Sequence, residues 1–94
     1  MESSKYRPAL VISNSSYNQR SLDIIVLRIT SKPKKEWAIK ITNKDVTNGF
    51  LEIESYVKVD SIFTVEKKMA AKVVAQLNAE KLGAVKMKLL ELFV

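Results

Sequence analysis

The chain has 94 residues, of which 47% are hydrophobic, enough for one compact domain and too few for two. It contains no cysteine and no histidine, which excludes a disulfide framework, thiolate metal sites and histidine as a general base, and no apolar run approaches the roughly 20 residues of a membrane helix. The net charge is +6, and residues 1–48 account for +5 of it, so a polyanion is the simplest partner for the first half of the chain.

The first half of the chain predicts three strands. Residues 7–13 and 22–31 are rich in β-branched side chains, and residues 14–21 between them have the composition of a turn. Residues 36–42 alternate apolar and polar side chains and predict a third strand. Residues 43–49 hold three turn-forming residues, so a loop is expected there.

The second half predicts a strand, an ambiguous segment and a helix. Residues 56–63 predict the fourth strand, whereas residues 66–77 fit a helix by composition and a strand by alternation. Asn78 is a suitable helix N-cap, and apolar residues then recur three and four positions apart, at Leu82, Val85, Leu89 and Leu92. An amphipathic helix over residues 79–93 is therefore expected. The predicted class is mainly β with α, a small barrel of short antiparallel strands with one packed helix.

Both faces of the first two predicted strands carry apolar residues, so we expect the C-terminal helix or a second copy of the chain to cover the second face. On that face, Arg7 stands at the start of one strand, and Arg28 and Thr30 stand at the end of the other. If the two strands pair antiparallel, these ends adjoin. Pro8 restricts Arg7 to an extended backbone and so gives its side chain a stiff support.

A guanidinium and a hydroxyl then converge beside a basic loop, Lys32-Pro33-Lys34-Lys35. Arginine can hold phosphate oxygens through two hydrogen bonds and stabilise the charge that develops in phosphoryl chemistry. Thr30 can donate a hydrogen bond to the same phosphate. Each feature also has a structural explanation: a surface arginine entering a strand, a β-forming threonine at a strand end, and a solvated lysine loop.

Four features follow one another along the chain: KYRPALVIS at residues 5–13, ITS at residues 29–31, VKVDSIFT at residues 57–64, and then a basic apolar segment with an amphipathic helix. In order and spacing they resemble the MazF/PemK toxin family of toxin–antitoxin modules. The resemblance implies an SH3-like small barrel of about five antiparallel strands plus a C-terminal helix, and it assigns residues 72–77 to a strand. Members of the family usually begin with one more strand, and this chain starts inside the loop that follows it.

The resemblance also implies an activity, metal-independent cleavage of single-stranded RNA by a homodimeric toxin that needs no cofactor. It carries the catalytic arginine onto Arg7 and the catalytic hydroxyl onto Thr30, with Ser31 adjacent as a third catalytic candidate. The candidate substrate-binding residues are Lys5, Asn14, Arg28, Lys32, Lys34 and Lys35. The implied partner is an antitoxin whose acidic tail occupies the RNA groove, and no membrane partner is expected. A cytoplasmic location is expected from the sequence itself, because no apolar signal region follows residues 1–4 and no apolar run is long enough for a membrane helix.

Two other classes of function remain open. The same barrel without its first strand could be a catalytically inactive module that binds RNA or antitoxin. A topoisomerase poison of the CcdB type is a third possibility, against which the Arg-Pro and Ile-Thr-Ser elements argue.

Overall fold

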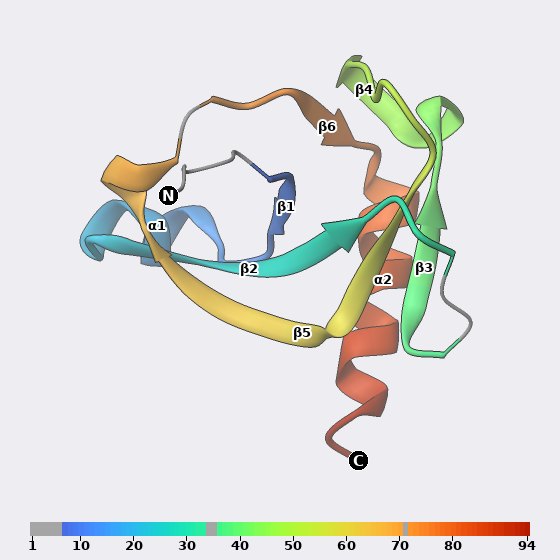
Figure 1. Ribbon diagram of the computed structural model, residues 1–94. Coiled ribbons are helices and arrows are strands. Elements are labelled where there is room, and N and C mark those ends of the chain that lie inside the picture. Colours follow the sequence, from blue (N-terminus) through green and yellow to red (C-terminus); the bar gives the residue numbers. More distant parts are fainter. Residues whose placement is uncertain (1–6, 34–35, 71) are drawn as a thin grey trace, which may run out of the picture.

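A computed structural model describes residues 7–33, 36–70 and 72–94. Its elements in chain order are β1 (Ala9–Val11), α1 (Ser15–Arg20), β2 (Asp23–Thr30), β3 (Ala38–Ile41), η1 (Asn43–Asp45), β4 (Val46–Gly49), β5 (Ser55–Glu66), η2 (Lys67–Met69), β6 (Ala75–Leu77) and α2 (Ala79–Glu91). Four strands form an antiparallel sheet in the order β1-β2-β5-β3, and β4 pairs with β6 in a second, two-stranded sheet (Figure 1). The predicted mainly β fold with a C-terminal helix is confirmed.

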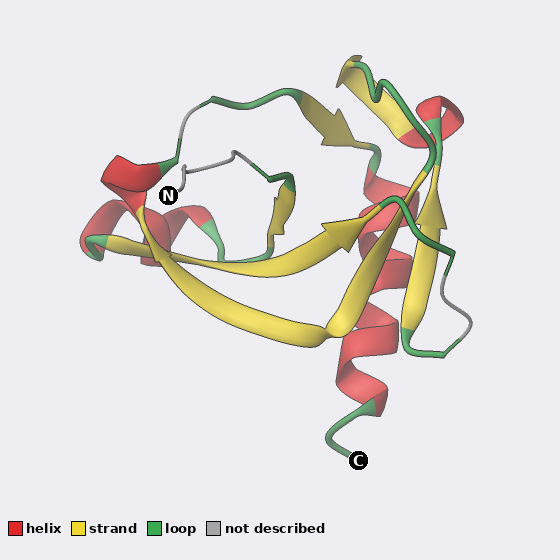
Figure 2. Ribbon diagram, in the orientation of Figure 1, coloured by secondary structure: helices red, strands yellow, loops and turns green. Residues whose placement is uncertain are grey.

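The larger sheet is strongly curled, because its two long strands, β2 and β5, bend together into a half-barrel (Figure 2). A break in register helps the bend. Leu27 is opposite Ile62, whereas the next residue, Arg28, is opposite Lys58, so residues 59–61 of β5 have no partner in β2. The backbone N–H of Val59 instead donates to the carbonyl of Trp37, at 2.9 Å. Such bulges bend a strand and redirect the side chains that follow.

One face of this sheet forms the core together with α2. Leu27, Ile41, Val57 and Val59 are fully buried against Val85 of the helix. Because side chains alternate along a strand, burying these residues fixes which neighbours lie on the other face. The predicted apolar stripe of the helix contributes through Val85, Leu89 and Leu92. Asn78 is the N-cap, its side-chain oxygen accepting from the backbone N–H of Lys81 at 2.7 Å.

Residues 14–21, predicted as a turn, instead contain the helix α1. Asn14 is its N-cap, and its Oδ1 accepts a hydrogen bond from the backbone N–H of Tyr17 at 2.9 Å. The prediction was wrong because short polar side chains favour both turns and helix N-caps through the same local hydrogen bonds. The Oγ of Ser13 ties this segment to β2 by accepting from the backbone N–H of Ile25 at 3.0 Å.

Residues 43–49, predicted as a loop, contain η1 and the strand β4. A capping box holds η1, in which the Thr42 hydroxyl accepts from the backbone N–H of Lys44 and the Asp45 carboxylate accepts from that of Thr42, at 3.3 Å and 2.9 Å. β4 then pairs with β6, its Val46 opposite Leu77. The loop prediction failed because this pairing partner lies far along the chain.

Strand and helix bounds also differ from the predicted ranges. β1 is shorter than residues 7–13 and β6 is shorter than residues 72–77, whereas β5 extends beyond residues 56–63 at both ends. β2 and β3 lie within residues 22–31 and 36–42, and α2 ends at Glu91 within the predicted 79–93. In the described part of the chain, no helix has the length and apolar character needed to cross a membrane.

Candidate functional site

The face of the larger sheet opposite the core, called here the open face, carries a row of polar side chains. The register pairs Thr30 of β2 with Tyr56 of β5, and Tyr56 with Lys40 of β3. Residues directly opposite one another in antiparallel strands point to the same side of the sheet. Their sequence neighbours belong to the core cluster, so these three side chains lie on the open face. A threonine, a tyrosine and a lysine therefore cross three strands in one row.

A second row, next to the first, brings two cations together. Arg28 is opposite Lys58 in the register of β2 and β5, and Ala9 and Ala38 flank the pair on the outer strands. Like charges directly opposite each other destabilise a sheet. The Nζ of Lys58 lies 3.5 Å from the Oδ1 of Asp60, which offsets part of this repulsion. An anion bound between the two cations would offset more of it.

Arg7 precedes β1 at the edge of the open face. The pairing of the two strands begins at Ala9, opposite Arg28, so Arg7 lies two residues before the paired part of β1 and Thr30 two residues beyond Arg28. Arg7 and Pro8 are both exposed. Pro8 has no N–H and restricts the residue before it, so the chain enters β1 in an extended form. The antiparallel pairing expected for these two strands is therefore present, and it brings their polar ends to the same corner of the sheet.

The hydroxyl of Thr30 is held by the loop that follows it. Its Oγ1 accepts a hydrogen bond from the backbone N–H of Lys32 at 3.2 Å. A hydroxyl that accepts in this way keeps its own O–H as a donor, so Thr30 can donate to a phosphate oxygen. Ser31 and Lys32 follow directly and are exposed at the same corner.

The other predicted site residues do not all join this group. Asn14 lies at the end of β1 remote from Arg7, and its side-chain oxygen is engaged as the N-cap of α1. The structure thus separates Asn14 from the corner and gives it a structural role. Three predicted lysines lie outside the described residues, namely Lys5, Lys34 and Lys35.

Three residues of the open face were missed from the sequence, Lys40, Tyr56 and Lys58. The alternation of Tyr56 and Lys58 with valines was the available signal, because it separates a polar from a buried face. No signal in the sequence indicated that β5 lies between β2 and β3 in the sheet.

Arginine and lysine side chains around a tyrosine suit a single-stranded nucleic acid, whose phosphates bind cations and whose bases stack on aromatic rings. Among the described residues, no group of three or more acidic side chains is placed to hold a metal ion.

Comparison with known proteins points to one family. The family model described as PemK-like, MazF-like toxin of type II toxin–antitoxin system matches residues 1–93. No curated protein matches the chain in sequence. The Mycobacterium tuberculosis toxin MazF-mt6 superimposes with a TM-score of 0.78 at 19% identity, over 93% of this chain and 85% of that one.

Two further solved structures include an antitoxin. An endoribonuclease in complex with its cognate antitoxin, from mycobacterial species, gives a TM-score of 0.75 at 19% identity, over 90% of this chain and 78% of that one. MazE-MazF from Deinococcus radiodurans gives 0.73 at 25% identity, over 92% and 83%. The half-barrel with a C-terminal helix is thus the fold of MazF-type toxins.

Proposed function

The chain belongs to the PemK-like, MazF-like toxin family of type II toxin–antitoxin systems, and on this premise we propose that it is an endoribonuclease that cleaves single-stranded RNA without a metal ion. The observation that carries the proposal is that the start of β1, which Arg7 precedes, adjoins the end of β2, which is Thr30, beside the opposed cations Arg28 and Lys58. The endoribonuclease among its structural neighbours supports the same activity.

In the proposed reaction the substrate supplies its own nucleophile. The 2′-hydroxyl oxygen attacks the adjacent phosphorus while the bond from phosphorus to the 5′-oxygen breaks, which gives a cyclic phosphate and a 5′-hydroxyl. The 2′-hydroxyl loses one proton and the leaving oxygen gains one. Arg7 stabilises the negative charge on the phosphoryl oxygens of the transition state, and Thr30 donates a hydrogen bond to the same group. Ser31, next in the chain, is the second hydroxyl at this corner.

The open face holds the rest of the RNA strand. Arg28 and Lys58 bind a phosphate between them, because an anion there relieves their mutual repulsion. Tyr56 offers an aromatic ring for base stacking. Lys32, at the corner, adds a further cation, and the loop residues Lys34 and Lys35 are proposed to extend this contact.

We test this activity with purified protein and unmodified single-stranded RNA in the presence of EDTA. We expect cleavage, and we expect Arg7→Ala to abolish it while circular dichroism shows an unchanged fold. Arg20→Ala, which removes an exposed arginine from α1, is the matched control and should cleave normally. Cleavage that persists in Arg7→Ala would reject the assignment. Wild-type protein that binds RNA without cleaving it would instead support the inactive binding module.

The proposed partners are an antitoxin and a second copy of the chain. An acidic antitoxin segment would compete with RNA for the cations of the open face, and the two antitoxin complexes among the structural neighbours support such a partner. A homodimer is supported by an apolar row on the same side of the sheet, where Val11 and Phe63, each 43% exposed, flank the buried Val26. We place the protein in the cytoplasm, with its RNA substrate.

A further inference from the structure

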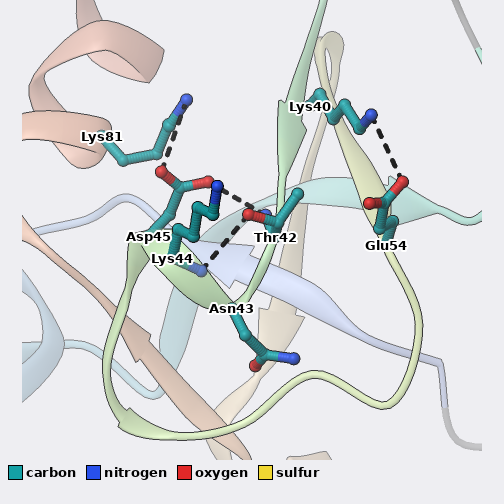
Figure 3. A pocket seen from close by; sticks show the side chains of 7 residues that line it. All are labelled: Lys40, Thr42, Asn43, Lys44, Asp45, Glu54 and Lys81. Carbon is teal, nitrogen blue, oxygen red and sulfur yellow. Dashed lines mark hydrogen bonds and ion pairs between the residues drawn. The ribbon is translucent and has the colours of Figure 1, made fainter.

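A shallow hollow of about 650 Å³ lies at the β3 edge of the sheet, the edge remote from β1, where the open face meets the start of α2. It is lined by Lys40, Thr42, Asn43, Lys44, Asp45, Glu54 and Lys81 (Figure 3). These residues come from β3, from η1 and its N-cap Thr42, from the segment before β5 and from the first turn of α2. Three lysines from three separate elements therefore meet at one place.

Positive charge exceeds negative charge in this hollow. The Nζ of Lys40 lies 3.3 Å from the Oε1 of Glu54, and the Nζ of Lys81 lies 3.7 Å from the Oδ1 of Asp45 (Figure 3). Within the described residues, Lys44 has no ion-pair partner. Both existing pairs are at least partly exposed, and exposed pairs are weak enough for a phosphate to displace a carboxylate.

The charge of Lys81 is opposed by the dipole of its own helix, and the ion pair with Asp45 offsets part of this cost. Lys81 is the third residue of α2, where the positive end of the helix dipole disfavours a cation. One wall of the hollow is fixed by Asn43, whose side chain both donates to and accepts from the backbone of Leu51, at 2.8 Å and 2.7 Å. The hollow therefore holds one more positive than negative side chain, beside a segment that these two hydrogen bonds fix.

The hollow is continuous with the row that begins at Thr30. Neighbouring strands are about 4.8 Å apart, so the backbone of Lys40 lies about 10 Å from that of Thr30, with Tyr56 between them. An extended RNA strand that passes from the corner over Tyr56 therefore reaches Lys40 at the rim of the hollow. This geometry favours a nucleic-acid backbone over an isolated anion.

We propose that the hollow is a second phosphate subsite for RNA, which binds a phosphodiester that flanks the one cleaved. Lys44 and Lys81 bind its oxygens, and Lys40 contacts the RNA backbone between Tyr56 and the hollow. The proposal rests on the proposed function, since it assigns a further part of the same substrate. It makes affinity depend on RNA length, because a strand too short to reach β3 leaves the subsite empty.

The test uses oligouridylates of 4, 8 and 12 nucleotides whose 2′-hydroxyls are methylated, so that they bind without being cleaved. Fluorescence anisotropy gives the dissociation constant of each at several salt concentrations. We expect wild-type protein to bind the longer strands more tightly than the 4-mer. Lys44→Gln and Lys81→Gln should each weaken binding of the longer strands by about threefold to tenfold and leave the affinity for the 4-mer unchanged. For the longer strands, the slope of log affinity against log salt concentration should also fall in magnitude by about one.

The control is Lys86→Gln, which removes one charge from an exposed position of α2 outside the hollow. It should retain the full gain with length, and fluorescence of the single tryptophan should show that all variants fold alike. An unchanged length dependence in Lys44→Gln and Lys81→Gln would overturn the subsite. So would a loss of affinity for poly-glutamate without a loss for the long oligouridylates, since the hollow would then take an acidic peptide.

Cleavage of unmodified RNA by the wild type is measured in parallel. Because the methylated strands report binding alone, a failure of cleavage counts against the proposed function and a failure of the length dependence counts against the subsite.

Discussion

The hydroxyl oxygen of Thr30 accepts a hydrogen bond from the backbone N–H of Lys32 at 3.2 Å, so the last residue of β2 is tied to the loop that follows it. The bond fixes the side chain and leaves its O–H as a donor toward the open face. This hydroxyl closes a turn and, in the proposed reaction, also binds the phosphate; separate measurements of folding and of cleavage distinguish the two roles.

Thr30→Val keeps the shape of the side chain and removes the hydroxyl. We expect kcat for RNA cleavage to fall by about 10²-fold or more, because a hydrogen-bond donor aimed at developing charge contributes on that scale. Thr30→Ser retains the donor and should recover most of the activity. The measurement is single-turnover cleavage with circular dichroism as a check of folding. Equal activity in the valine and serine variants would leave the hydroxyl only its turn-closing role.

Arg28→Gln should move stability and RNA binding in opposite directions. Removing one of two opposed cations relieves their repulsion, so the free energy of unfolding should rise by about 0.2–1 kcal/mol in urea titrations. RNA affinity should fall, with a salt slope smaller by about one, because one phosphate contact is lost. Lys86→Gln is again the charge-matched control. If Arg28→Gln lowered both the free energy of unfolding and the affinity for RNA, Arg28 would be a structural residue.

The two glycines of the chain should respond oppositely to alanine. Gly49 has φ of 72°, and a Cβ there would clash with the carbonyl oxygen of Val74, the residue directly before β6. Gly49→Ala should therefore lower stability by more than about 1 kcal/mol. Gly83 is in the middle of α2 with open space at its Cβ, so Gly83→Ala should raise stability by about 0.5–1 kcal/mol. Thermal unfolding of both variants gives the comparison.

Phe63→Glu should disrupt self-association. The variant puts a charge beside Val11 and Val26, on the apolar row where we propose that the second copy docks. The molar mass measured by light scattering after size-exclusion chromatography should fall from that of a dimer to that of a monomer. Ile53→Glu, which alters an exposed apolar residue outside that row, should remain dimeric. A wild type that is monomeric at every concentration would reject this interface.

Local signals predicted well where one residue decides the structure. Asn78 was expected to cap the C-terminal helix and does so, since capping depends on a hydrogen bond to a residue three positions away. Asn14 caps a helix in the same way, yet its surroundings were interpreted as a turn because turns use the same residues. Strand β4 was not predictable, because it is specified by pairing with β6 and its own sequence resembles a loop.

The amino-acid sequence by itself determined the presence of β2, β3 and β5, the amphipathic helix and the family to which the chain belongs, because these depend on β-branched composition, side-chain periodicity and motif order. Tertiary structure alone decided that β5 lies between β2 and β3 and that its bulge sets Lys58 opposite Arg28. It also brought Lys44 and Lys81 to one hollow. Register and strand order arise from contacts between distant segments, which no local pattern encodes.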